Sequence, residues 1–117
     1  MYNVFMLPRK YRASRISIED VIKNGTIVSA DFIYAKISRG VTKNTNFAVV
    51  VPKKTEKTSV GRHLIKRRVN SVIENYIENL PDLGKTIVFF VKKTEKQPSF
   101  KDIKSEIYLI FQKILKK

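Results

Sequence analysis

The sequence predicts an α+β domain, a two-layer α/β sandwich in which a four-stranded mixed sheet packs on helices in the element order α-β-β-β-α-β-α. Short stretches rich in Val, Ile, Phe and Tyr alternate with longer segments in which apolar residues recur at steps of three and four. No internal repeat, low-complexity tract or linker interrupts this pattern. We therefore expect a single domain over residues 1–117, with residues 1–15 as a flexible basic arm.

A short helix is expected first, between Ser17 and the Asn-Gly pair at residues 24–25. The Ser-Ile-Glu-Asp sequence that opens it has the Ser-x-x-acid spacing of a helix start, and the glycine suggests a left-handed stop. Its apolar side chains recur on one side: Ile18, Val21 and Ile22.

Three strands are predicted next, over residues 26–29, 31–38 and 47–51. The first two form a hairpin or meander, and a polar turn with Gly40 precedes the third. Pro52 ends the third strand because proline has no backbone N–H to donate. Large and smaller residues alternate in this strand, so Phe47, Val49 and Val51 are expected to face the core.

A long helix should begin at Thr58 or Ser59 and continue to Leu80, because its apolar stripe is the most regular in the chain. A fourth strand, residues 86–91, is apolar on both faces and is therefore expected at the centre of the sheet. The Ser-Phe-Lys-Asp sequence at residues 99–102 opens a final amphipathic helix.

The charge balance is unusual for so short a chain. The sequence has 24 Lys and Arg against 10 Asp and Glu, a formal net charge of +14 at pH 7. The self-repulsion of such a domain is most easily explained by a polyanionic partner, and a nucleic-acid backbone is the usual one. An anionic membrane surface and an acidic protein are the alternatives.

Several other classes of protein are excluded or disfavoured. The chain has no cysteine, which excludes disulfides, thiolate nucleophiles and Cys-type zinc sites. No apolar run is long enough for a signal peptide or a membrane span, so we expect a cytoplasmic location and no membrane partner. His63 has no second histidine beside it, and the acidic residues do not pair. We therefore expect no catalytic residue and no metal site formed by the protein alone.

Positive charge is concentrated at the entrance to the long helix. Between residues 53 and 68 seven Lys and Arg stand against one acid, Glu56. Helix N–H groups attract anions there, and guanidinium forks match phosphate oxygens. A second cluster lies in the arm. The candidate RNA-binding residues are Arg9, Lys10, Arg12, Arg15, Lys53, Lys54, Lys57, Arg62, His63, Lys66, Arg67 and Arg68. A solvated face and a disordered tail are the alternatives.

From about Leu7 to its end, the chain resembles the protein component of bacterial ribonuclease P. The resemblance rests on the basic start at residues 7–12, the segment at 20–25, the lysine pair after the third strand, the final amphipathic helix and, most specifically, residues 62–68. The family usually has Arg-Asn-Arg-x-Lys-Arg in that last segment. Three residues match it, Arg62, Lys66 and Arg67, and two depart from it, His63 and Leu64.

The resemblance implies a fold like the second domain of a small-subunit ribosomal protein, with a left-handed strand-helix-strand crossover. It also implies that ribonuclease P RNA binds the catalytic Mg²⁺ and removes the 5′ leader of precursor tRNA. The basic motif and arm would contact that RNA, while a cleft between the first helix and the sheet holds the leader. The cleft candidates are Ile18, Ile22, Phe32, Tyr34, Ala48 and Val50, with the hydrophobic core as their alternative location. Many family members have Phe where Ile18 and Ile22 stand.

Two other functions are compatible with parts of the pattern. A non-catalytic ribosomal or general RNA-binding protein would have the same charge and the same element order. A peripheral membrane protein is disfavoured, because the basic residues do not form one face opposite a large apolar face.

Overall fold

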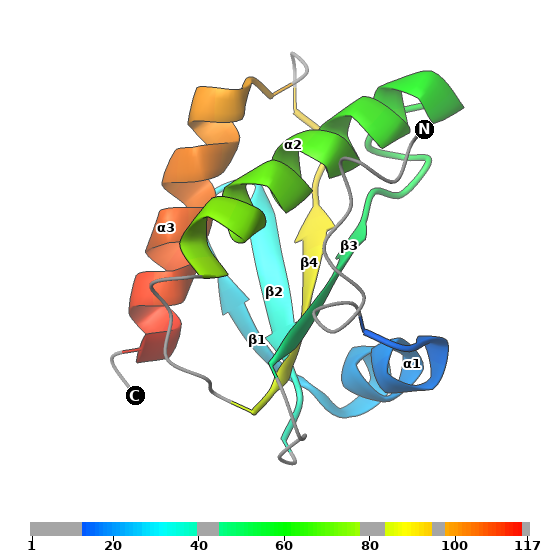
Figure 1. The fold of residues 1–117 in the computed structure, drawn as a ribbon. Coiled ribbons are helices and arrows are strands. Elements are labelled where there is room, and N and C mark those ends of the chain that lie inside the picture. The colour runs from blue at the N-terminus through cyan, green and yellow to red at the C-terminus, as the bar shows by residue number, and fades with distance from the viewer. Residues whose placement is uncertain (1–12, 40–44, 78–83, 95–97, 116–117) are drawn as a thin grey trace.

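Four strands form a single sheet in the computed structural model, which describes residues 13–39, 45–77, 84–94 and 98–115. The elements are α1 (Arg15–Asn24), β1 (Thr26–Ser29), β2 (Ile33–Ile37), β3 (Asn46–Val50), α2 (Ser59–Ile77), β4 (Thr86–Val91) and α3 (Phe100–Leu115). Helices α2 and α3 cover one face of the sheet, and α1 packs against the other (Figure 1). The predicted α+β class and the predicted order of elements are confirmed.

The sheet is mixed and has the strand order β1-β2-β4-β3. β1 pairs with β2, and β2 with β4, in antiparallel fashion, whereas β3 and β4 are parallel. Every residue of β4 is buried, which confirms that the apolar segment at residues 86–91 is central. The outward and inward alternation of β3 is also confirmed, because Phe47 and Val51 are buried and Val49 packs against the same core.

The connection from β3 through α2 to β4 is left-handed. In Figure 1 both strands run upward, α2 passes in front of the sheet, and β4 lies to the left of β3 at their upper ends. A right-handed connection, the overwhelmingly common kind, would place β4 on the right. The left-handed crossover implied by the family resemblance is therefore present.

The larger core lies between the sheet and the two long helices. Three aromatic rings meet in it, with Phe47 6.2 Å and Phe89 5.9 Å from Phe111 between ring centroids. The other fully buried large side chains of this core come from β2, β4, α2 and α3: Ile33, Ile87, Ile65, Val69, Val72, Ile73, Ile103, Ile107 and Ile110. The apolar stripes predicted for the two long helices therefore face this layer.

The first helix differs from its prediction at both ends. It begins at Arg15, because the Ser14 hydroxyl accepts a hydrogen bond from the Ser17 N–H at 3.1 Å and caps it one turn earlier than expected. The expected left-handed stop is wrong, because Gly25 is extended with φ −73° and ψ 159°. A glycine is needed there for space, since a Cβ would lie 2.5 Å from the Val21 carbonyl oxygen.

The last helix begins where the sequence predicts. Ser99 and Asp102 exchange side-chain to backbone hydrogen bonds of 3.3 and 3.2 Å, which is the reciprocal capping expected from the Ser-x-x-acid spacing. Phe100 does not join the apolar stripe that the periodicity suggests, because it lies on the first turn and is 41% exposed.

One buried acid joins α3 to the sheet. Glu106 is only 4% exposed, and its Oε1 accepts hydrogen bonds from the N–H groups of Phe32 at 2.7 Å and Ile33 at 3.1 Å. These two residues lead into β2, immediately before Tyr34. A carboxylate of α3 thus fixes the start of the strand that carries one of the candidate cleft residues. None of the helices within the described ranges is both long and apolar enough to span a bilayer.

Candidate nucleic-acid interface

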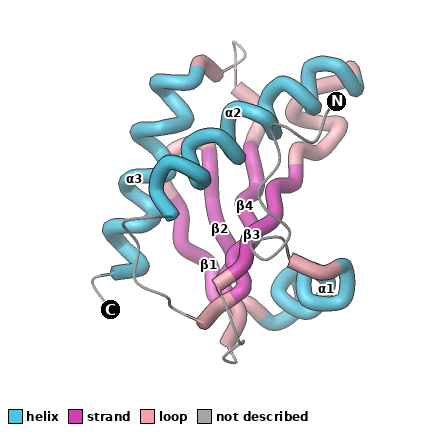
Figure 2. The backbone as a smooth tube through the Cα atoms, in the orientation of Figure 1, coloured by secondary structure: helices cyan, strands magenta, loops and turns pink. Residues whose placement is uncertain are grey.

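The predicted basic segment spans the loop after β3 and the first half of α2. The three lysines of the loop, Lys53, Lys54 and Lys57, are exposed. The helical members are half-buried, and these are Arg62, His63, Lys66, Arg67 and Arg68. The structure therefore brings the residues between 53 and 68 onto one end of the molecule, where β3 ends and α2 begins (Figure 2).

Arg15, the arm cation that the structure describes, does not join this surface. Arg15 is exposed at the first residue of α1, which packs on the opposite face of the sheet from α2. The other three predicted members, Arg9, Lys10 and Arg12, lie outside the described residues.

The start of α2 is closed by its own loop. The Thr58 hydroxyl accepts a hydrogen bond from the Gly61 N–H at 3.0 Å, so Thr58 caps the helix. The Glu56 carboxylate turns back to the Thr58 N–H and hydroxyl at 3.5 and 3.4 Å. Gly61 makes room for it, because a Cβ there would lie 2.5 Å from Cγ of Glu56. The single acid of the basic segment is therefore engaged locally.

Two arginines of the basic segment also donate hydrogen bonds to backbone carbonyl groups of neighbouring loops. Nη1 of Arg62 donates to the carbonyl oxygens of Glu56 at 3.0 Å and Lys57 at 2.9 Å. Nη1 of Arg68 donates to the carbonyl oxygen of Pro98 at 2.7 Å. A guanidinium has five N–H donors, so these contacts leave Nε and Nη2 of each arginine to meet an anion.

The outer side of α2 combines charge with exposed apolar surface. His63 and Arg67 are one helical turn apart, and they line a shallow hollow together with Val60 and Leu64. Val60 is 79% exposed. Leu64 stands where the family motif usually has a second arginine, so this part of the surface offers van der Waals contact in place of a second guanidinium.

A second candidate surface lies on the face of the sheet that α1 covers. Ile18, Tyr34, Ala48 and Val50 pack around a small buried cluster formed by Val21, Val88 and Phe90. Four of the six predicted cleft residues are therefore brought together. Ile22, 40% exposed on α1, lies at its margin, where its carbonyl oxygen accepts a hydrogen bond from Nζ of Lys36 at 2.9 Å.

Phe32 is separated from this group. It packs against the core cluster between the sheet and the two long helices, and its N–H is bound by Glu106. Phe32 lies just before β2, so the alternation of side chains that places Tyr34 on the α1 face does not extend to it. The predicted grouping of Phe32 with Tyr34 on one surface therefore does not occur.

The α1 face contains a stacked aromatic pair that sequence reasoning missed. Tyr34 and Phe90 are 4.9 Å apart between ring centroids, with only 7° between their planes. Lys92 Nζ lies 5.5 Å from the Tyr34 centroid, and Lys36 Nζ lies 5.7 Å from that of Phe90. We call these four side chains the aromatic column. Phe90 is not distinguishable from core residues by sequence, because only the β2–β4 register places it opposite Tyr34.

A mixed sheet with a left-handed crossover, a basic segment leading into the crossover helix and an aromatic column flanked by lysines define a small α+β RNA-binding protein. The family model described as Ribonuclease P matches residues 7–115. The chain belongs to the ribonuclease P protein family. Membership implies a partner RNA component, which the concentration of positive charge independently suggests.

Solved structures of this family share the fold. The RNase P protein from Staphylococcus aureus has a TM-score of 0.73 and 17% identity, covering 89% of this chain and 94% of its own. The RNase P protein from Thermotoga maritima has a TM-score of 0.72 and 17% identity, covering 86% of this chain and 96% of its own. Identities this low show a common fold only. No curated protein sequence matches the chain.

Proposed function

We propose that this ribonuclease P protein subunit binds its partner RNA through the basic segment and holds the 5′ leader of precursor tRNA along the α1 face. The assembled ribonucleoprotein then removes the leader and produces the mature 5′ end. The observation that supports the leader site is the aromatic column, in which two stacked rings lie between two ammonium groups. The partner RNA carries out the cleavage.

The column suits a single strand of varied sequence. Every base has a π face, so stacking on an aromatic ring is favourable whatever the base, by about 1–3 kcal/mol for each base. A base that stacks on Tyr34 takes the place of the Lys92 side chain, which is long and moves easily. The displaced ammonium group then lies close to a backbone phosphate.

The surroundings of the column provide space without directional hydrogen bonds. Ala48 and Val50 on β3 are small and only half-buried, and Ile18 on α1 packs against the same cluster. Ile22 adds exposed apolar surface at the margin. Such a groove accepts bases of any identity, as a leader whose sequence varies between precursors requires.

The partner RNA meets the other surface. Lysines of the β3–α2 loop and the free N–H groups of Arg62 and Arg68 are available to phosphates there, and each neutralised phosphate releases counterions. Within the described ranges no three His, Asp or Glu side chains come together as a metal site. Magnesium ions are held in this proposal by RNA phosphates, and the protein contributes by neutralising the neighbouring charge.

Reconstitution tests the proposal. The protein is added to a ribonuclease P RNA, and 5′ maturation of precursor tRNA is followed over a range of Mg²⁺ concentrations. We expect the protein to lower the Mg²⁺ required and to tighten binding of a precursor with a leader more than that of mature tRNA. A protein that changes neither the rate nor either affinity is not a ribonuclease P subunit of this kind.

A further inference from the structure

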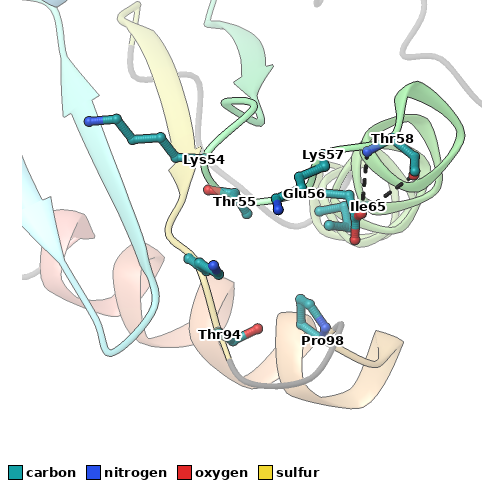
Figure 3. A pocket seen from close by; sticks show the side chains of 9 residues that line it. Lys54, Thr55, Glu56, Lys57, Thr58, Ile65, Thr94 and Pro98 are labelled. Carbon is teal, nitrogen blue, oxygen red and sulfur yellow. Dashed lines mark hydrogen bonds between the residues drawn. The ribbon is translucent and has the colours of Figure 1, made fainter.

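A pocket of about 400 Å³ lies at the carboxyl ends of the parallel strands β3 and β4. One wall is the loop that leads into α2, residues 54–58, and the other is formed by Lys93, Thr94 and Pro98 ahead of α3 (Figure 3). We call it the loop pocket. Neither the aromatic column nor the outer side of α2 includes it.

Both walls of the loop pocket are held in place by side chains. The Thr55 hydroxyl donates to the Val91 carbonyl oxygen at 2.5 Å and ties the first wall to the end of β4. Arg62 binds two carbonyl oxygens of the same wall, and Arg68 binds that of Pro98 in the second. The shape of the pocket is therefore set before a ligand arrives, which reduces the entropy lost on binding.

The lining carries excess positive charge. Among the described residues that line it are three lysines, Lys54, Lys57 and Lys93, and one acid, Glu56. The carboxylate is turned toward Thr58, and Figure 3 shows the Lys54 side chain extending away from both. Among the described residues, none of the three ammonium groups makes a hydrogen bond or an ion pair. An anion between the two walls would be attracted by Lys57 on one side and Lys93 on the other.

The pocket lies where the basic segment, which forms one of its walls, meets the residue that follows Lys92 of the aromatic column in sequence. Lys92 belongs to the aromatic column, and the next residue, Lys93, lines the pocket. The first wall, residues 54–58, continues directly into α2 and its basic motif. Ile65 and Pro98 add apolar surface beside the charges. A polynucleotide that crosses the end of the sheet would place its backbone at this point.

We propose that the loop pocket binds a phosphodiester group of an RNA backbone between the lysines of its two walls. The inference rests on the proposed function, which requires RNA at both surfaces, and adds a contact that connects them. The same chemistry can be supplied by the partner RNA or by the precursor leader, and two binding measurements distinguish these sources.

The test replaces one lysine in each wall, Lys57→Gln with Lys93→Gln. Binding is measured against salt concentration, first to ribonuclease P RNA alone and then, with the assembled complex, to precursor tRNA. Loss of one phosphate contact should reduce the slope of log K against log salt by about 0.7–0.9. A smaller slope for binding to ribonuclease P RNA identifies the partner RNA as the source of the phosphate. A smaller slope for binding to precursor tRNA, with the slope for ribonuclease P RNA unchanged, identifies the leader.

The matched control removes two positive charges from α3, Lys104→Gln with Lys113→Gln, and should leave both slopes unchanged. The pair Lys57→Arg with Lys93→Arg should retain the wild-type slope, because it keeps the charge. Wild-type slopes for the glutamine pair in both measurements would overturn the loop pocket as a phosphate site. If wild-type protein still lowers the Mg²⁺ requirement in that case, the proposed function stands without it.

Discussion

Glu106 allows a quantitative test of how α3 positions the start of β2. Its carboxylate is buried and is the acceptor for the N–H groups of both Phe32 and Ile33. Replacing it with methionine keeps an unbranched side chain of similar length but removes the acceptor. Two buried donors are then left without a partner, at about 1–3 kcal/mol each. The free energy of unfolding should therefore fall by about 2–6 kcal/mol.

That loss is large compared with the total stability of a small domain, which is about 5–15 kcal/mol. Glu106→Gln is the matched variant, because its amide oxygen can accept from the same N–H groups while the charge is lost. Hydrogen bonds to a charged acceptor are stronger than neutral ones, so we expect Glu106→Gln to cost about 1–2 kcal/mol.

The assay is equilibrium unfolding in urea, with the midpoint and the slope measured for each variant. Equal losses for the methionine and glutamine variants would refute the argument, because the lost acceptor would then not be the cause. A methionine variant that loses less than about 1 kcal/mol would also refute it, since both N–H groups would then have another acceptor, such as water.

Three further predictions concern the RNA surfaces. Tyr34→Ala should weaken binding of a leader-containing precursor by about 1–3 kcal/mol without affecting mature tRNA in a filter-binding assay, while Tyr34→Phe keeps the stacking ring. Arg62→Lys keeps the charge but cannot reproduce the paired contacts to residues 56 and 57, so limited proteolysis should cut that loop faster than in wild type. Gly61→Ala should lower the unfolding midpoint, and lower it less when combined with Glu56→Ala, because the added methyl group meets both the Glu56 side chain and the Thr58 hydroxyl and the second change removes only the first of these contacts. A midpoint lowered equally in both backgrounds would contradict that packing.

The elements themselves could be predicted because their signals are local. The apolar run at residues 86–91 is continuous, and it forms the central strand. The capping pair of Ser99 and Asp102 is three residues apart, and it starts α3 as expected. The start of α1 was misplaced because Ser14 and Ser17 are both suitable caps, and the choice between them depends on which hydroxyl meets a free N–H.

The functional surfaces were only partly predictable. The density of Lys and Arg between residues 53 and 68 is visible in the sequence, and the structure places these residues at one end of the molecule. Phe32 and Tyr34 cannot be distinguished in the same way. They are two residues apart where β2 begins, yet Phe32 packs against the larger core and Tyr34 stacks on Phe90 on the α1 face.

Local periodicity by itself determined which segments are helices and strands, and the concentration of charge predicted a polyanionic partner, because both depend on residues close together in the sequence. Only the tertiary structure decided that β4 lies between β2 and β3, that the crossover is left-handed and that Tyr34 faces Phe90. It also decided that the arginines of α2 hold the two walls of the loop pocket. These features depend on contacts between residues distant in the chain, whose free energies no local pattern contains.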